Sequence, residues 1–179
     1  MVPEAPLEPT EHGLVHKGDG WFILNAQEAP WRHAEGRGAY SDLEGEDWFE
    51  QYGIHLVVLE PGDPMAMYHW EADQEDFLVL SGEALLIVEG EERPLRQWDF
   101  VHCPPKTSHV IVGAGDGPCV VLAVGARANQ DGPDWGGYPV DETALRHDAG
   151  VKEETNKGEE AYAHVQRRQL TRYRDGWLP

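Results

Sequence analysis

Short apolar runs alternate with turn-forming residues through the middle of the chain. The runs are rich in valine, isoleucine and leucine, and each is too short for a typical helix. Glycine and proline, as in Pro61-Gly62 and Pro104-Pro105, separate them at roughly 8 to 12 residues, a spacing typical of an all-β sandwich or barrel. The pattern therefore predicts a single antiparallel β barrel at residues 53–127. Its expected strands are residues 54–59, 65–70, 76–80, 84–88, 97–103, 109–112 and 119–124.

Two neighbouring runs are separated only by a glycine-rich turn. The first run, residues 109–112, is followed directly by Gly113, and the second run, residues 119–124, begins directly after Pro118. Because a short loop between two strands commonly joins antiparallel neighbours, we expect these two runs to pair as a β-hairpin.

The segment before the barrel differs from it in composition. Residues 1–20 are rich in proline, glutamate and glycine and have no periodicity, which predicts a flexible N-terminal segment. Residues 21–52 contain several tryptophan and phenylalanine side chains spaced by glycine and acidic residues. Such side chains seldom stay exposed in numbers, so we expect residues 21–52 to form an arm that packs on the barrel.

The segment after the barrel is predicted to be a C-terminal extension with short helices, at residues 128–179. It starts with a linker at residues 128–133, which are rich in Asn, Asp, Gly and Pro. A short helix is expected at residues 141–147, with Asp141 as its N-cap. A second is expected within residues 153–168, where Gly158 weakens it.

The charge balance narrows the range of partners. The chain has 14 basic and 33 acidic residues and a formal net charge of −19. Such a surplus repels phosphate backbones and anionic headgroups, so we expect no nucleic-acid and no membrane partner. A local basic cluster is expected to dock on the chain's own acidic surface. It consists of Arg167, Arg168, Arg172 and Arg174.

Other features suggest a cytoplasmic protein. The two cysteines, Cys103 and Cys119, lie in apolar runs and are too few for a disulfide framework, so we interpret them as free thiols. The N-terminal residues do not show the basic segment followed by an apolar stretch that is typical of a secretory signal. No run approaches the ~20 apolar residues of a membrane span.

Candidate metal ligands converge on one face of the predicted barrel. If residues 65–71 form a strand, its period of two places Met67, His69 and Glu71 on the same face. Glu75, in phase with Phe77, can rejoin that face, and His109 comes from a later strand. Imidazole and carboxylate groups inside a barrel can hold a divalent transition metal. The alternatives are packed or surface histidines and, for Glu71, a surface acid or a group that supports the ligands.

The first half of this pattern resembles a motif of the cupin superfamily. That motif has a glycine, a spacer, His-x-His, a glutamate three or four residues later, and a glycine six residues further on. Here Gly62, His69, Glu71, Glu75 and Gly82 follow the same order and spacing. One residue departs from it, because Glu71 stands where the second histidine is usual.

The second half resembles the other cupin motif, which reads Gly, five residues, Pro-x-Gly-x-x-His, three residues, Asn. Pro104 and His109 match its proline and histidine in type and spacing. Trp98 and Lys106 stand where glycines are usual, and Gly113 stands where asparagine is usual.

The resemblance implies a double-stranded β-helix, a jelly-roll barrel that is often dimeric and binds iron, manganese, nickel, zinc or copper. Carried over residue by residue, it implies His69, Glu75 and His109 as ligands, with Glu71 as a candidate fourth ligand. If Glu71 is not a ligand, we expect it to act as a general base beside the metal. A carboxylate in place of an imidazole adds charge and a harder ligand, which favours iron or manganese over copper. Zinc and nickel are further candidates.

These features predict a metal-dependent cupin that acts on a small molecule, as an oxygenase, isomerase or hydrolase. Met65, Met67, Phe77 and Val79 would form the apolar wall of its site. The alternatives are a non-catalytic binding or storage cupin and a metal-free structural domain, because one fold can host all three. Apolar residues opposite the ligands indicate a face covered by the N-terminal arm or by a partner subunit, so we expect a homodimer. They are Trp70, Leu78 and Leu80.

Overall fold

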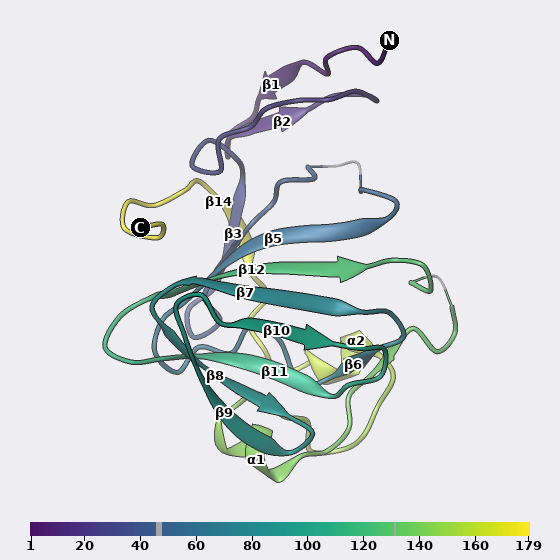
Figure 1. The fold of residues 1–179 in the computed structure, drawn as a ribbon, viewed down its shortest axis with the longest axis vertical. Helices are drawn as coiled ribbons and strands as arrows, with labels where there is room; N and C mark the ends of the chain where they lie inside the picture. The colour runs from purple at the N-terminus through teal and green to yellow at the C-terminus, as the bar shows by residue number, and fades with distance from the viewer. Residues whose placement is uncertain (46–47, 131) are drawn as a thin grey trace.

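Two β-sheets face each other and enclose the core in the computed structural model, which describes residues 1–45, 48–130 and 132–179 (Figure 1). The larger sheet has the order β10-β7-β12-β5-β4-β3-β14, and the smaller has the order β11-β8-β9. Glu46 and Asp47 of the predicted arm and Asp131 of the predicted linker lie outside the described residues. The fold is an all-β double-stranded β-helix, as the sequence predicts.

The elements of the described chain are mostly short strands. They are β1 (Leu7–Pro9), β2 (Leu14–His16), β3 (Trp31–His33), β4 (Ala39–Ser41), β5 (Tyr52–Leu59), β6 (Trp70–Glu71), β7 (Glu75–Ser81), β8 (Glu83–Val88), β9 (Glu91–Arg96), β10 (Phe100–Cys103), β11 (His109–Ala114), β12 (Cys119–Ala126), β13 (Gly136–Gly137), α1 (Glu142–Arg146), α2 (Gly158–Ala161) and β14 (Gln169–Thr171). Among the described residues, neither helix is long enough to cross a membrane.

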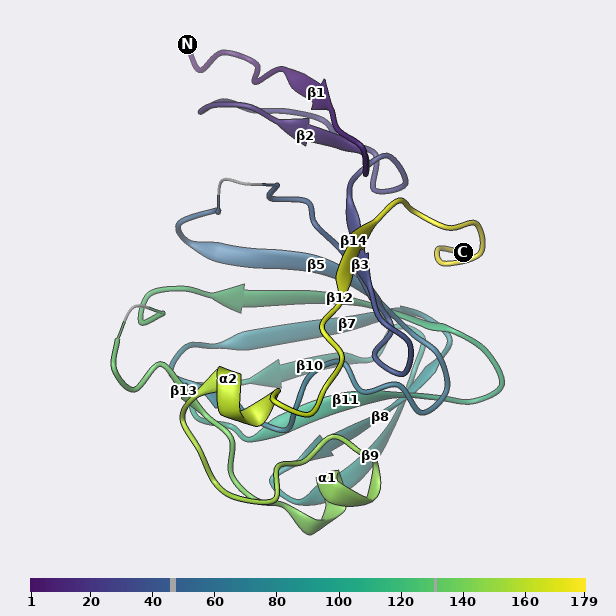
Figure 2. The same cartoon turned by 180° about the vertical axis from the view of Figure 1, so that it is seen from behind.

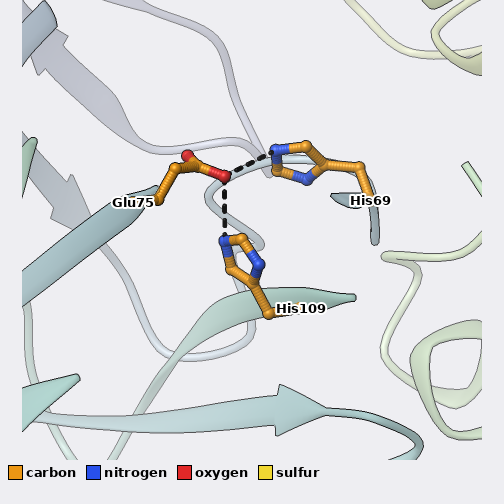
Figure 3. Close-up of side chains that lie close together, drawn as sticks. All are labelled: His69, Glu75 and His109. Carbon is orange, nitrogen blue, oxygen red and sulfur yellow. Dashed lines mark ion pairs between the residues drawn. The ribbon is translucent and has the colours of Figure 1, made fainter. Parts of the chain in front are cut away.

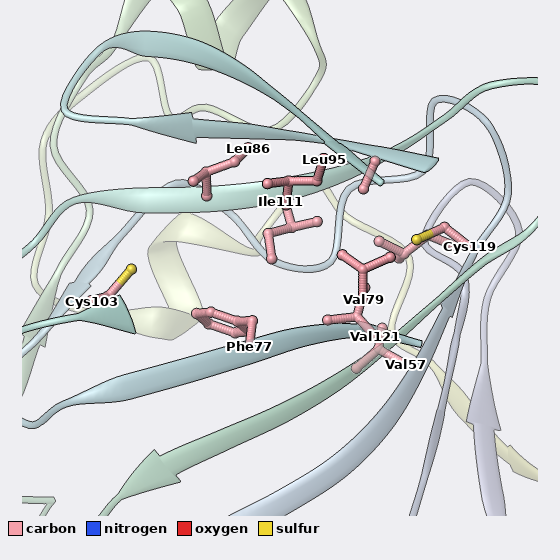
Figure 4. Close-up of a cluster of buried hydrophobic side chains, with 11 residues drawn as sticks. Val57, Phe77, Val79, Leu86, Leu95, Cys103, Ile111, Cys119 and Val121 are labelled. Carbon is pink, nitrogen blue, oxygen red and sulfur yellow. The ribbon is translucent and has the colours of Figure 1, made fainter. Parts of the chain in front are cut away.

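The main core lies between the two sheets, where alternate side chains of each strand point inward (Figure 4). In β7, Phe77 and Val79 are buried in this core, whereas Leu78 between them is only partly buried. The free thiols of Cys103 and Cys119 belong to the same core. The core consists of Val57, Leu59, Phe77, Val79, Ala84, Leu86, Leu95, Cys103, Ile111, Cys119 and Val121.

The predicted hairpin between residues 109–112 and 119–124 is wrong. β11 pairs with β8 in the smaller sheet, whereas β12 pairs with β5 and β7 in the larger one. The intervening turn therefore carries the chain from one sheet to the other. β12 is central in its sheet and has both edges occupied, which leaves no edge on which β11 could pair.

The predicted strand at residues 65–71 is reduced to β6. The backbone here changes partner, because Met65 N donates to Ile111 O and Tyr68 N donates to Ala149 O in the C-terminal extension. The period of two is therefore lost between Met67 and His69. Met67 is fully buried beneath the extension, against Tyr138, Val151 and Ala161, and does not line the predicted apolar wall.

β9 has no counterpart among the predicted strands. Only Leu95 in it is buried, and the other residues are exposed, so it lacks the apolar pattern by which strands are recognised. It is a strand because all its residues pair with β8. The predicted strand at residues 97–103 is correspondingly shorter and begins at Phe100.

The N-terminal segments extend the barrel. β1 and β2 form a short antiparallel hairpin within residues 1–20, where composition predicts flexibility, and this hairpin stands off from the two sheets (Figure 1). β3 and β4 add to the edge of β5 and so continue the larger sheet. Trp31 of β3 is fully buried on the outer face of this sheet, against Val58 and Val120.

The C-terminal extension covers two further surfaces. β14 pairs with β3 and completes the larger sheet, as Figure 2 shows from behind. Tyr173, Trp177 and Leu178 then pack on the cluster around Trp31. α1 is capped as predicted, because the Asp141 side chain accepts a hydrogen bond from Ala144 N.

Candidate metal centre

The two candidate histidines lie side by side because their backbones pair. His69 N donates to His109 O at 3.1 Å, and His109 N donates to His69 O at 2.8 Å. Residues paired in this way on antiparallel segments carry their side chains on the same face. The imidazole rings therefore lie close together, with centroids 5.1 Å apart.

Each imidazole is oriented by a hydrogen bond at Nδ1. Nδ1 of His69 lies 2.8 Å from Met67 O, and Nδ1 of His109 lies 3.0 Å from Thr107 O. A carbonyl oxygen can only accept, so Nδ1 carries the proton in both neutral rings. Nε2 of each ring then has a free lone pair, which is the state in which histidine binds a metal.

Glu75 completes the cluster from the first residue of β7 (Figure 3). Its Oε2 lies 3.7 Å from His69 Nε2 and 3.5 Å from His109 Nε2. One ligand atom from each of the three residues lies within 4.8 Å of the other two. The structure thus brings together the three residues that the cupin resemblance implies as ligands.

Burial keeps both rings neutral. The side chains of His69 and His109 are 13% and 3% exposed, and burial lowers the pKa of both histidines. The neighbouring His69 lowers the pKa of His109 further. Burial raises the pKa of Glu75, although His109 opposes this shift.

This donor set fits a divalent cation. Two nitrogen lone pairs face a carboxylate oxygen at distances longer than a hydrogen bond, so the three groups repel one another unless a positive charge lies among them. Two imidazoles and one carboxylate are a common set for iron, manganese and zinc.

Glu71 lies beside this trio. Its Oε1 is 3.8 Å from His69 Nε2, and its side chain is 25% exposed. Burial and then the charges of Glu75 and Asp73 raise the pKa of Glu71 to about 8. Glu71 also faces the cavity in which the trio lies. Glu71 thus lies beside the three-residue group, outside the 4.8 Å set, and its carboxyl group holds its proton near pH 7 unless a cation bound nearby favours the ionised form.

A cavity of about 550 Å³ opens onto the trio. This volume is in the range of small-molecule sites. Met65 and Phe77 line it, as predicted, whereas Val79 lies in the core between the sheets. His55 also lines the cavity, and its alternation with Val57 and Leu59 in the sequence is the signal that favours this position.

Sequence reasoning missed several polar residues of the cavity. They are Arg32, Tyr40, Asp42, Glu44, Arg127, Tyr162 and Arg168. They come from the N-terminal arm, the end of β12 and the C-terminal extension, and no local pattern marks them. The prediction that Arg168 docks on an acidic surface is wrong, because its guanidinium donates to the backbone carbonyls of Arg37 and Met65.

Two residues that replace motif glycines, Trp98 and Lys106, still adopt the backbone conformation that favours glycine. Trp98 and Lys106 have φ of 76° and 70°, in the left-handed region where glycine is usual. Gly113 stands where a Cβ would lie 2.2 Å from Glu60 O, so only glycine fits there. The turns of the second motif are thus preserved despite the changed residues.

Comparison with known families supports the same fold. Residues 55–125 match the cupin domain family. This range runs from within β5 to within β12 and includes the histidine and glutamate cluster. No curated protein is significantly similar to the chain.

Solved structures share the barrel. One is an uncharacterized conserved protein with a double-stranded β-helix domain from Klebsiella pneumoniae, with 24% identity, a TM-score of 0.50, and coverage of 60% of this chain and 90% of that chain. Another is the polyketide cyclase RemF from Streptomyces resistomycificus, with 14% identity, a TM-score of 0.50, and coverage of 59% and 78%. These similarities show the fold alone.

A third similar structure is a putative sugar phosphate isomerase from Acidithiobacillus ferrooxidans. It is 34% identical, with a TM-score of 0.42, over 44% of this chain. The chain spans only 52% of that protein's length.

Proposed function

Because residues 55–125 of this chain form a cupin domain, we propose that it holds one divalent transition metal ion and acts on a small molecule in the adjoining cavity. The observation that carries this proposal is the convergence of three ligand atoms within 4.8 Å of one another. The hydrogen bonds that aim both Nε2 atoms at Glu75 support it.

In this proposal His69, Glu75 and His109 hold the metal. A bound metal ion would supply Lewis-acid or redox chemistry to a substrate of the oxygenase, isomerase or hydrolase type. Glu71 is either a fourth ligand or the group that accepts a substrate proton, since its carboxylate lies in the same cavity. Phe77, whose ring centroid lies 5.2 Å from that of His109, holds this imidazole in place.

The ligand chemistry favours iron or manganese. Glu75, and Glu71 if it joins, are hard oxygen donors, which suit these ions better than copper. Zinc and nickel also accept two imidazoles and a carboxylate and are the next candidates.

Metal analysis tests the assignment. We expect about one divalent ion per chain after dialysis of metal-loaded protein, and a loss of most of it in His69→Ala and His109→Ala, because each change removes one of three ligands. His102→Ala is the matched control, since His102 is a partly exposed histidine that pairs with Asp76. Equal metal in the wild type and in all three variants would refute the metal centre.

Turnover separates an enzyme from a binding or storage protein of the same fold. The metal-loaded protein is incubated with a panel of small molecules, and substrate loss is followed by mass spectrometry. We expect conversion of at least one compound and its absence in His109→Ala. Saturable binding of a compound without conversion would instead support the storage alternative.

We also propose that the protein is a homodimer. Trp98 and Phe100 are 67% and 64% exposed, and β10 is an edge strand of the larger sheet. Exposed apolar side chains on a strand edge are commonly covered by another chain. Light scattering at micromolar concentration should give the mass of a dimer, and Phe100→Glu should lower it, whereas a monomeric wild type would contradict the proposal.

A further inference from the structure

Arg37 is a buried arginine that has no acidic partner among the described residues. It is 6% exposed, its Nη1 lies 3.7 Å from the Met67 sulfur, and its Nη2 is buried without a hydrogen-bond acceptor among the described residues. Its guanidinium lies over the ring of Tyr162, at 5.8 Å from the centroid. A buried guanidinium is ordinarily paired with a carboxylate, but none of the described residues supplies one to Arg37.

A second arginine lies against the first. Nε of Arg168 donates to Arg37 O at 2.9 Å, and Nη2 donates to Arg37 O and, at 2.9 Å, to Met65 O. These bonds fix the guanidinium, which also lies over the Tyr40 ring at 5.5 Å from the centroid, but none of these contacts is with a carboxylate. Nη1 donates to no acceptor in the described part of the chain. Unlike Arg37, Arg168 lines the cavity.

The other two arginines of the cavity are neutralised by acidic residues. Arg32 pairs with Asp42 at 2.8 Å, and Arg127 pairs with Glu44 at 2.6 Å. No carboxylate of the described residues lies within 4 Å of Arg37 or Arg168, although 33 acidic residues face only 14 basic ones.

The protein environment works against both charges. Burial lowers the pKa of Arg37 and of Arg168, and the charge of Arg37 lowers that of Arg168 further. Asp63 acts on both from a distance, in the opposite direction, without an ion pair. Two neighbouring positive charges held in this way provide a strong field for an anion.

This pair of arginines is connected to the candidate metal centre. The Met67 sulfur contacts Arg37, and the carbonyl of the same residue orients His69. Arg168 also lines the same cavity as His69, Glu75 and His109. A small molecule bound there can therefore contact the arginine and the metal ligands together.

We propose that Arg168, backed by the charge of Arg37, forms an oxyanion subsite that binds a carboxylate or phosphate group of the small molecule. The proposal rests on the proposed function, since it defines the class of ligand that the cavity takes. Arg168 suits both groups because the N–H groups of its Nη1, which donate to no acceptor among the described residues, can form charge-assisted hydrogen bonds to their oxygens. Arg168 is the contact residue. The Arg37 backbone carbonyl holds it in place, and the buried Arg37 guanidinium adds its positive charge.

The test measures anion binding to the metal-free protein, so that the metal cannot be the binding group. Inorganic phosphate and malonate are titrated in EDTA at low ionic strength and followed by calorimetry, with malonamide as the uncharged counterpart of malonate. We expect at least one anion to bind at millimolar concentration and malonamide not to bind. The anion that binds with the higher affinity indicates whether the natural group is a phosphate or a carboxylate.

Variants assign the binding to Arg168. Arg168→Gln should weaken binding about tenfold or more, whereas Arg172→Gln, which removes the same charge from an exposed residue nearby, should change it less than about twofold. Arg168→Lys keeps the charge but not the guanidinium N–H groups, so it should give an intermediate loss. Arg37→Met should also weaken binding, because it removes the positive charge beside Arg168. The protein should remain folded by circular dichroism, because the change leaves no acidic partner unpaired among the described residues.

Two results would overturn the subsite: no anion binding by the wild type, or equal binding by Arg168→Gln, Arg37→Met and Arg172→Gln. Metal content is measured on the same variants and should not change. If the wild type binds metal normally but binds neither anion, this result contradicts only the subsite. Absence of metal with normal anion binding contradicts only the proposed metal centre.

Discussion

Glu71→His is expected to change which metal the protein retains. The substitution replaces a hard, charged oxygen donor by a neutral imidazole beside His69, from whose Nε2 the Glu71 carboxylate lies 3.8 Å away. Imidazole is the better ligand for zinc, nickel and copper. After dialysis against an equimolar mixture of manganese, iron, zinc, nickel and copper, the ratio of the last three to the first two should rise about tenfold or more.

Glu71→Gln is the matched control, because it keeps the shape of the side chain without its charge. If Glu71 is a ligand, Glu71→Gln should lower metal content. If Glu71 is instead a general base, both variants should retain the wild-type metal and lose turnover by roughly 10²- to 10⁴-fold. A Glu71 without either role would leave metal preference and turnover unchanged, and this result would contradict the proposal for this residue.

Glu44→Gln is expected to destabilise the fold strongly. Both carboxylate oxygens of Glu44 bind the Arg127 guanidinium, at 2.6 and 3.0 Å, and Glu44 is 3% exposed. The same carboxylate accepts a hydrogen bond from Phe49 N. Breaking a buried pair leaves an uncompensated charge, so the free energy of unfolding should fall by about 3 to 5 kcal/mol, as measured by urea denaturation.

The control for this effect is Glu91→Gln, because the pair of Glu91 with Arg93 is solvent-exposed on β9. An exposed pair contributes roughly 0 to 1 kcal/mol, so the urea midpoint should hardly move. Equal midpoints for Glu44→Gln and Glu91→Gln would show that the Arg127 pair does not hold the N-terminal arm to the barrel.

Local sequence patterns were sufficient to predict most strands of the barrel and the histidine and glutamate residues of the candidate metal site. β5, β7 and β8 coincide closely with apolar runs of the sequence, because both faces or one face of each strand is buried. His69, Glu75 and His109 were recognisable because their spacing follows two motifs with turns between them. The conformations at Trp98 and Lys106 show that the turns persist even where the glycines do not.

Pairing and long-range contacts were decided by the tertiary structure. The turn between β11 and β12 looks like a hairpin loop, yet each strand has its partners in a different sheet. Met67 is in phase with His69 in the sequence, yet its side chain packs against Tyr138 and Val151 of the C-terminal extension, where it is fully buried.

The fold class and the three candidate ligands could therefore be predicted from the sequence alone, because strand patterns and the two motifs depend on neighbours within a few positions. The arginines around the cavity, in contrast, could be identified only from the three-dimensional packing. Arg37 and Arg168 are 131 residues apart in the chain, and their contact depends on how the C-terminal extension packs on the barrel. No local pattern encodes that contact, since the packing of distant segments depends on the whole fold.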